Sequence, residues 1–436
     1  MFEIMVGIAG ILIFLALLIT SLPVAFSMLL VGVVGVIVLR SPVAAIHMIN
    51  TSFISSFAAY TTTVIPMFIL MGAIAGYSGI SSGLINAIST CIGHLRGGVA
   101  MGVQAICAAF GAVCGSIPAT LATVGKIAYP DMEKLGYDQK LSTGALCAGS
   151  TLAVLIPPSI TCITYSMVTT ESVSSLFLSI IMAGIVMTII YMVCIKIWAT
   201  VKPEAAPRSK RYSGKERWNA IRNGNFVEIL VIFVISMGGL FTGLFTATEA
   251  GAVGVIGVII VTFITKKITW KKLVESMIET LNLSITIYFL LACASVFGKF
   301  VSISGIPYAL AQWVTMSAFP AGVILLLITL TFLVLGMVID GTAMILLLVP
   351  IFYPIITGPL GLNGLWFGVY VVVVLGLAMM SPPIAINTYI MQNISGVPLQ
   401  KIFVGVVPFI ICNLLMCVLL ILFPDFFLLV PNLMGI

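Results

Sequence analysis

Long apolar runs separated by short polar stretches extend along the whole chain. Segments such as Ile8–Leu22 and Val227–Leu244 are almost entirely aliphatic or aromatic. A helix of about 20 apolar residues crosses a hydrocarbon core of about 30 Å. The pattern therefore predicts an all-α, polytopic membrane protein.

The predicted spans form two sets of five, separated by a polar linker at residues 200–225. The fourth span of each set is a broken helix, with its break near residue 157 in the first set and near residue 382 in the second. The units joined by the linker are residues 1–199 and 226–436. The spans of the first unit are 3–22, 24–40, 61–79, 140–170 and 174–199, and those of the second are 226–244, 248–265, 284–303, 363–393 and 402–428.

Two more apolar regions, 98–130 and 321–357, are interrupted by small polar sequences. These are Cys114-Gly115-Ser116-Ile117-Pro118 and Asp340-Gly341-Thr342. Each region is too short to cross the membrane twice comfortably, so we expect a re-entrant hairpin with its tip at mid-depth. Such irregular backbone is tolerated where protein or a watery cavity covers it.

An amphipathic stretch precedes each predicted hairpin. We expect both stretches to be arm helices along the membrane interface, and a short helix packed inside the protein is the alternative. The apolar face of the first consists of Leu84, Ile88, Ile92 and Leu95, and that of the second of Ile306, Leu310, Trp313 and Val314.

Lysine and arginine residues concentrate on one predicted side of the membrane. The linker and the turn at residues 266–272 are rich in both, whereas Arg40 and Lys299 fall on the other side. Because basic loops stay in the cytoplasm, we expect this side to be cytoplasmic and both termini to face out. Residues 3–22 show no signal-peptide pattern, so we expect a retained helix there.

Composition excludes several classes of function. Hydrophobic residues make up 61% of the 436 residues and charged residues only 7%, far below the roughly 25% of soluble domains. The nine cysteines lie in apolar surroundings without a CxxC pair, which favours packing. No ATP-binding P-loop is present, and the net charge of +6 indicates topology and contact with anionic lipids, with no need for a nucleic-acid partner.

The two units share an ordered series of matching positions. Gly79-Ile80 matches Gly305-Ile306, and Gly115-Ser116 matches Gly341-Thr342, both at an offset of 226. Pro157-Pro158 matches Pro382-Pro383 at 225. With an odd number of spans per unit, the copies must insert in opposite directions. Inverted repeats with interrupted helices are typical of secondary transporters.

The polar positions of the repeat coincide with its backbone breaks. A double proline opens a helix, because proline lacks an N–H and clashes with the carbonyl one turn earlier. The freed carbonyls and nearby hydroxyls offer oxygen ligands to a cation, and half-helix N-termini offer N–H groups to an anion. The breaks are Pro157-Pro158-Ser159 and Ser381-Pro382-Pro383, beside the tips Gly115-Ser116 and Asp340-Gly341-Thr342.

Asp340 is the acidic residue deepest in a predicted membrane region, and its first-half counterpart is Cys114. A buried carboxylate needs a partner or a cation, so Asp340 is either a cation ligand or a cap of its own hairpin tip. Polar residues beyond the breaks are candidates for substrate contact, with helix capping and interhelical hydrogen bonds as the alternative. They are Ser159, Thr161, Thr164, Asn387, Thr388 and Asn393.

Several segments together resemble the large membrane subunit of tripartite ATP-independent periplasmic (TRAP) transporters, over essentially the whole chain. The segments are Ile65-Pro66-Met67-Phe68-Ile69-Leu70-Met71-Gly72, Cys114-Gly115-Ser116, Leu155-Ile156-Pro157-Pro158-Ser159 and Ser381-Pro382-Pro383. The resemblance implies membership of the ion transporter superfamily and an elevator motion in the bacterial inner membrane.

The resemblance also implies sodium-driven import of an organic acid of the C4-dicarboxylate or sialic acid class. It implies a periplasmic substrate-binding protein and a separate small four-helix membrane subunit as partners. By the same resemblance, one sodium site falls at Gly115, Ser116, Ile156 and Pro157, and another at Gly341, Thr342, Met379 and Ser381.

Three other functions are possible on the sequence alone. A stand-alone sodium- or proton-coupled anion carrier of the same superfamily would need no binding protein. A passive channel would not accumulate its solute. An intramembrane enzyme would need a carboxylate dyad, a HExxH helix or a Ser/Lys pair at mid-depth, and the sequence contains none of these.

Overall fold

The computed structural model describes residues 1–436 except 21, 224–225, 317–318, 338, 383–384 and 435–436, and omits the side chains of 80–82, 84–86, 223 and 226–229. Its described part is helical and contains no β-strand. Six helices in that part are long and apolar enough to cross a membrane. The prediction of an all-α polytopic membrane protein is confirmed.

The first half of the chain ends with one long helix, α10 (Val173–Val201). The helices before it are α1 (Phe2–Ile19), α2 (Val24–Leu39), α3 (Pro42–Ala58), the 3-10 turn η1 (Tyr60–Thr63), α4 (Val64–Tyr77), α5 (Ile80–Ile92), α6 (Gly98–Cys114), α7 (Ile117–Lys134), α8 (Gln139–Thr151), η2 (Leu152–Val154) and α9 (Ile160–Thr169).

The linker contains η3 (Pro203–Ala205) and α11 (Gly214–Asn223). The second half then forms α12 (Phe226–Phe241), α13 (Ala247–Ile264), α14 (Trp270–Ile303), α15 (Ile306–Met316), α16 (Ala321–Gly336), α17 (Gly341–Thr357), α18 (Gly364–Met380), α19 (Ile386–Ser395), α20 (Leu399–Leu422), α21 (Pro424–Phe427) and α22 (Leu429–Leu433). The predicted hairpins correspond to α6–α7 and α16–α17, the broken helices to α8–α9 and α18–α19, and the arms to α5 and α15.

Four elements differ from the sequence prediction. The last predicted span, 402–428, is divided between α20, which ends at Leu422, and α21, which begins at Pro424. Helix α3 was not predicted, because its polar residues Asn50, Thr51 and Ser52 lower its hydropathy, yet Ser41 caps it and Pro42 occupies its first turn. The predicted span 284–303 is the second part of α14, which is 34 residues long and begins at Trp270. The linker, predicted only as polar chain, contains the amphipathic helix α11.

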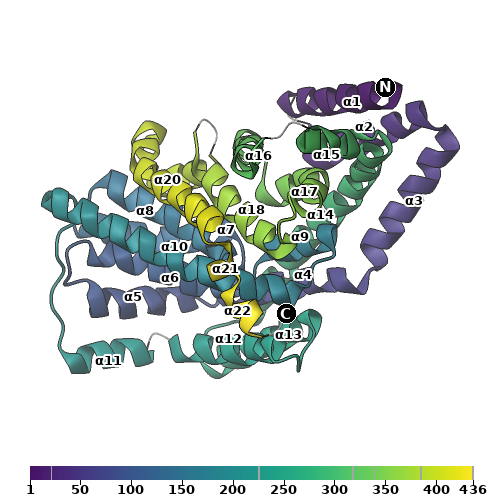
Figure 1. The fold of residues 1–436 in the computed structure, drawn as a ribbon. Helices are drawn as coiled ribbons and strands as arrows, with labels where there is room; N and C mark the ends of the chain where they lie inside the picture. The colour runs from purple at the N-terminus through teal and green to yellow at the C-terminus, as the bar shows by residue number, and fades with distance from the viewer. Residues whose placement is uncertain (21, 224–225, 317–318, 338, 383–384, 435–436) are drawn as a thin grey trace.

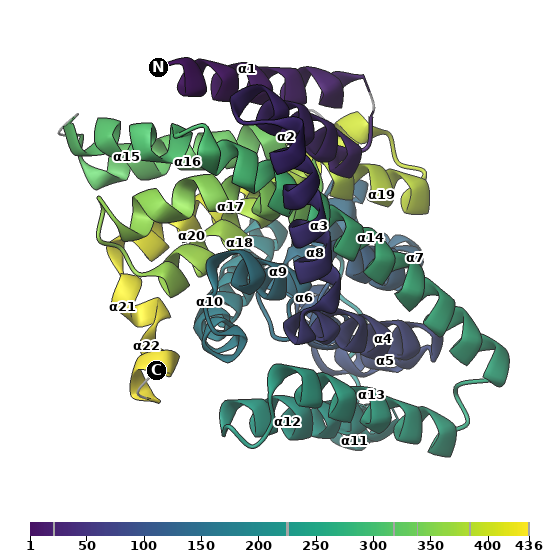
Figure 2. The same ribbon diagram turned by 90° about the vertical axis from the view of Figure 1, so that its right-hand side faces the viewer.

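The helices pack as two groups that meet along one boundary (Figures 1 and 2). We call residues 2–77 and 226–316 the frame, in which α2, α3 and α4 pack on α14 and α13 packs on α4. We call residues 98–201 and 321–422 the bundle, in which α8 packs on α20 and α9 on α17. The groups touch where α4 meets α6 and where α14 and α15 meet α17. Both groups therefore contain helices from both halves of the chain.

The helix order of the second half follows that of the first. Helix α5 begins at Ile80 and α15 at Ile306, and α10 begins at Val173 and α20 at Leu399, so both pairs are 226 positions apart. The first half departs from this order where α3, η1 and α4 occupy the place of the continuous α14 and where the turn η2 precedes the break, and the second half ends with two further short helices, α21 and α22. Two units of related sequence would give this order, and their opposite insertion stays a prediction.

Glycines allow helices of the two halves to touch at their backbones within the bundle. A Cβ on Gly144 of α8 would lie 2.1 Å from the carbonyl oxygen of Gly405 in α20, and a Cβ on Gly405 would lie 2.2 Å from the carbonyl oxygen of Lys140. Such close approach is the usual role of small residues between membrane helices. The α8–α20 contact therefore requires glycine on both sides.

We expect Gly144→Ala to destabilise the protein, because its methyl group would push against backbone that cannot rotate away. Overpacking of this kind costs about 1–3 kcal/mol. Gly238→Ala in α12 is the matched control, since nothing lies within 4 Å of its added Cβ, and the alanine should be neutral or slightly stabilising. Thermal unfolding of the purified protein in detergent measures both. Equal melting temperatures for the two variants would contradict this account of α8–α20 packing.

Candidate functional site

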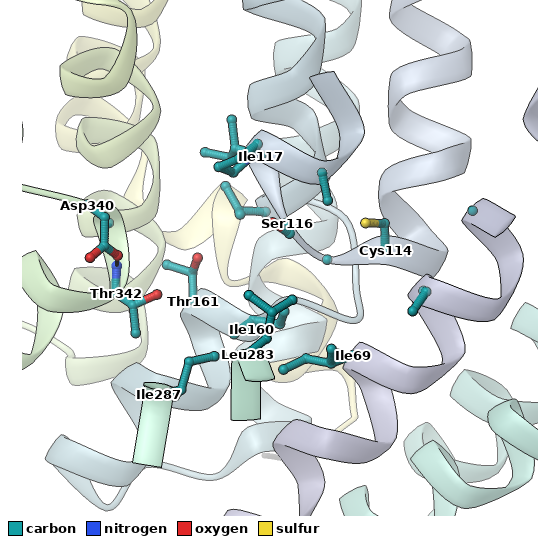
Figure 3. Close-up of a pocket in the computed structure, with 18 of the residues that line it drawn as sticks. Ile69, Cys114, Ser116, Ile117, Ile160, Thr161, Leu283, Ile287, Asp340 and Thr342 are labelled. Carbon is teal, nitrogen blue, oxygen red and sulfur yellow. Dashed lines mark hydrogen bonds between the residues drawn. The ribbon is translucent and has the colours of Figure 1, made fainter. Parts of the chain in front are cut away.

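A cavity of about 600 Å³, which we call the first cavity, lies on the boundary between frame and bundle (Figure 3). Its frame wall consists of α4 from Ile69 to Tyr77 and α14 from Glu279 to Leu290. Its bundle wall includes both hairpin tips, which we call the first tip (residues 114–116) and the second tip (residues 340–342). The two polar interruptions predicted from sequence thus face one space.

The first tip is held against the break in the first broken helix. Gly115 adopts a φ of 62°, which favours glycine, and lets the chain reverse between α6 and α7. Its carbonyl oxygen accepts a hydrogen bond from the N–H of Ile160 at 3.4 Å, and a Cβ on Gly115 would lie 2.6 Å from the carbonyl oxygen of Pro158. The Pro157–Pro158 peptide bond is cis. Hairpin and broken helix therefore meet through their backbones.

The first tip also contacts the frame directly. A Cβ on Gly72 of α4 would lie 2.8 Å from the Cα of Cys114. Glycine at this position lets α4 approach the end of α6 without an intervening side chain. The Ser116 hydroxyl forms no hydrogen bond with another described residue, and the side chain is partly exposed to the cavity. It is therefore available to a ligand.

The second tip is organised by Asp340, which caps the N-terminus of α17. Oδ1 of Asp340 accepts hydrogen bonds from the N–H groups of Thr342 at 2.8 Å and Ala343 at 3.4 Å. Both bonds use the same oxygen, and no backbone N–H among the described residues donates to Oδ2. The side chain is exposed to the cavity. Asp340 can therefore cap its helix and still offer an oxygen to a cation, so the two predicted roles are compatible.

Thr161 lies between the two tips at the start of α9, as Figure 3 shows. The surrounding wall is mainly aliphatic, with Ile69, Ile117, Ile160, Leu283 and Ile287 facing the same space. A few polar groups in an apolar pocket typically orient a small ligand. The described part of the chain contains no group of three or more His, Cys, Asp or Glu residues that could hold a metal ion. Any cation here would rely on hydroxyl and carbonyl oxygens beside the carboxylates of Asp340 and Glu279.

Two charged residues on the cavity wall were not assigned a role from sequence. Lys126 faces the cavity from α7, and Glu279 faces it from α14. The helical spacing could have indicated that Lys126 faces the cavity, because Ala119, Thr123 and Lys126 share one face of α7 that leads away from the first tip. It was missed because a lysine near a helix end is also expected to reach for the membrane surface.

The predicted site residues fall into two groups. Those that line the first cavity are Gly115, Ser116, Thr161, Asp340, Gly341, Thr342 and Met379. Those that do not are Ile156, Pro157, Ser159, Thr164, Ser381, Asn387 and Thr388. Ser159 caps α9 by accepting a hydrogen bond from the N–H of Cys162 at 3.4 Å, and Asn393 is exposed elsewhere. Pro383 lies outside the described residues.

The hydroxyls behind the cavity mostly bond to their own helices. Thr164 donates to the carbonyl of Ile160 at 2.9 Å, Ser381 to that of Leu377 at 2.8 Å, and Thr388 to that of Ala385 at 2.8 Å. Asn387 is fully buried, its Nδ2 lies 3.4 Å from the Ser150 hydroxyl, and its Oδ1 has no partner among the described residues. In this conformation these side chains bond within the protein near the breaks and do not face the first cavity.

Comparison with known proteins identifies the family. The model of the DctM component of tripartite ATP-independent periplasmic transporters matches residues 11–426. The chain belongs to this family. It is therefore a transporter subunit and not an enzyme, and it is a multi-pass protein of the bacterial inner membrane. As the family name implies, a TRAP large permease works with a small membrane subunit and a periplasmic binding protein.

Named relatives of this TRAP permease differ in substrate. The C4-dicarboxylate TRAP transporter large permease of Pseudomonas aeruginosa is 33% identical over 377 residues, covering 86% of this chain and 87% of the relative. The sialic acid TRAP transporter large permease of Vibrio cholerae is 28% identical and covers 96% and 97%. The ectoine TRAP transporter large permease of Halomonas elongata is 29% identical and covers 94% and 95%.

Solved structures share the fold at low sequence identity. The YdaH transporter of Alcanivorax borkumensis aligns with a TM-score of 0.63 at 13% identity, covering 88% of this chain and 89% of its own. MtrF of Neisseria gonorrhoeae aligns with a TM-score of 0.55, also at 13% identity. These likenesses support the architecture of the TRAP permease fold and carry no information on its substrate.

The cap made by Asp340 gives a stability prediction that is independent of transport. Asp340→Ala should lower the melting temperature, because loss of an N-cap costs about 1 kcal/mol. Asp340→Asn should retain most of the stability, because asparagine caps a helix about as well. Thermal unfolding in detergent would measure both. If Asn destabilises as much as Ala, the carboxylate charge and not the cap holds the second tip.

Proposed function

We propose that this TRAP permease imports an organic acid anion by a sodium-coupled elevator motion, with its substrate delivered by a periplasmic binding protein. The observation that carries the proposal is the first cavity, where both hairpin tips, two carboxylates and several hydroxyls face a single, mainly apolar space. Sodium is a hard cation that suits carbonyl, hydroxyl and carboxylate oxygens. An organic acid would bind beside it, because the cation compensates its charge.

The oxygen groups divide into two candidate sodium sites. At the first tip, the Ser116 hydroxyl lies next to the contact between Gly115 and Pro158. At the second tip, Asp340 and Thr342 line the cavity and would offer a carboxylate and a hydroxyl oxygen. Ile156, Pro157, Met379 and Ser381, which the family resemblance adds, would contribute main-chain or hydroxyl oxygens. Thr161 lies between the tips and is the best-placed substrate contact.

The frame and the bundle supply the two bodies that an elevator needs. Both tips and both broken helices belong to the bundle, so a bound ion and substrate would move with it as one unit. The frame presents the long, continuous α14 to this unit. We propose that the small membrane subunit braces the frame from outside, in agreement with the apolar side chains exposed on its helices, such as Ile8, Leu12 and Ile54.

The names of the relatives guide the choice of substrate. Two of these relatives are named for a C4-dicarboxylate and for sialic acid, and both compounds are carboxylates. We therefore propose a carboxylate substrate for this permease, with succinate and N-acetylneuraminate as the first two compounds to try.

We expect uptake by liposomes that contain this permease, its small subunit and its binding protein to require an inward sodium gradient. Labelled succinate or N-acetylneuraminate is the measured solute. Replacing external sodium with potassium should abolish accumulation, and collapsing the sodium gradient with an ionophore should release it. Accumulation that survives both treatments would contradict sodium coupling.

Ser116→Ala and Thr342→Ala should each raise the sodium concentration that gives half-maximal uptake, because each removes a hydroxyl oxygen from a tip. The expected change is about fivefold, which corresponds to about 1 kcal/mol. Thr331→Ala is the control, since Thr331 is an exposed hydroxyl on α16 that bonds to its own helix. If the sodium dependence of both tip variants matches that of the control, the tips are not the ligands.

A further inference from the structure

A second cavity, of about 460 Å³, lies on the same boundary. Its frame wall comes from the end of α3, from η1 and from α14 between Leu291 and Ser302. Its bundle wall comes from the end of α9, at Met167 and Val168, and from α17 at Leu346 and Pro350. No residue predicted from sequence as a site lines this space, so the second cavity is a separate feature.

The second cavity continues the path of the first along three shared helices. Helix α14 lines the first cavity up to Leu290 and the second from Leu291 onward. On the bundle side, α9 runs from Thr161 to Met167 and α17 from Thr342 to Leu346 between the two cavities. At 1.5 Å per residue, these intervals are about 9 Å and 6 Å. One to two helical turns of α9 and α17 therefore separate the two cavities.

The lining of the second cavity suits an anion. Lys299 is its one charged residue, whereas the first cavity has Asp340 and Glu279 beside Lys126. The Nζ of Lys299 donates to the Thr51 hydroxyl at 3.2 Å and forms no ion pair with any described residue. Lysine has three N–H donors. Two donors therefore remain for a ligand.

Hydroxyl groups line the same cavity as Lys299. Ser56, Thr61, Ser295 and Ser302 line the second cavity, and none of their hydroxyls forms a hydrogen bond with another described residue. Serine and threonine inside helices normally bond to a carbonyl one turn earlier, as Thr51 does here. Four hydroxyl donors without partners and one unpaired cation form a set that a carboxylate can satisfy.

We propose that the second cavity is an anion-binding site in which Lys299 holds a carboxylate group of the substrate before it reaches the tips. The inference rests on the proposed function for the identity of the anion. The site is on the side of the membrane predicted to face out, where a binding protein would release its load. From there, the wall of α14 leads directly to the first cavity.

A labelling experiment tests the site without relying on transport. Ser302→Cys places a thiol in the second cavity, and its reaction rates with the anionic reagent methanethiosulfonate ethylsulfonate and with neutral methyl methanethiosulfonate are compared. We expect Lys299→Gln to lower the anionic-to-neutral rate ratio at least threefold, because the ammonium group concentrates anions near the thiol. Lys271→Gln, at the other end of α14, is the matched control and should leave the ratio unchanged. The chain without the added cysteine gives the background.

Three labelling results would overturn the proposal. An unchanged ratio in Lys299→Gln would show that the lysine does not attract anions into the cavity. An equal fall in Lys271→Gln would show a general surface effect. No reaction with either reagent would show that the cavity is closed to water. None of these results depends on sodium, so they are distinguishable from a failure of the proposed function.

Uptake kinetics in the complete three-component system provide a second test of the proposal. Lys299→Gln should raise the concentration of loaded binding protein that gives half-maximal uptake at least fivefold, while the sodium dependence stays as in the unmodified protein. Lys299→Arg should keep this value within twofold, since it retains the charge. A fall in maximal rate alone, shared by Gln and Arg, would mark Lys299 as a structural residue and overturn the proposal.

Discussion

The constraint on which this structure depends is that backbone polar groups need partners where water is absent. Each hairpin tip and each double-proline break interrupts a helix and leaves N–H and C=O groups unpaired. The chain satisfies some of them by capping, with Asp340 on α17 and Ser159 on α9, and others by contact, as when Ile160 donates to Gly115. Residues of both tips line the first cavity. The irregular backbone that needs capping thus lies where a ligand can reach it.

The two halves of the chain interlock inside the bundle more tightly than the bundle meets the frame. Within the bundle, Gly144 and Gly405 bring α8 and α20 into backbone contact, and α9 packs on α17 across the halves. Along the boundary with the frame, two cavities interrupt the packing. Missing contacts forfeit dispersion energy, so displacement along the two cavities disturbs less packing than displacement at the α8–α20 contact. In the proposed cycle, the boundary is where movement takes place.

The sequence predicts where the helices are interrupted. It does not predict how far the cavities beside these interruptions extend. The hairpins, the broken helices and both tips follow from apolar length and from glycine and proline, whose effects are local. Helix α3 was not predicted because its polar residues Asn50, Thr51 and Ser52 lower the mean hydropathy of an otherwise largely apolar segment. Glu279 and Lys299 could not be assigned, because a cavity arises where distant helices meet, and no single segment encodes it. Thr164, Ser381 and Thr388 matched the expected residue type, yet their hydroxyls bond to their own helices.

The unequal charge of the two tips sets a condition on the proposed cycle. The first tip is neutral, with Cys114, and the second carries Asp340. A net charge that moves past an aliphatic wall such as Leu283, Ile287 and Leu290 is penalised by the low local dielectric. A sodium ion at the second tip only cancels Asp340, so the charge of an anionic substrate must be compensated elsewhere in the bundle. Lys126 of α7, on the wall of the first cavity, or a second cation at the neutral first tip would balance a monoanion. On this argument the charged tip compensates only itself, and the substrate is compensated by Lys126 or at the neutral tip.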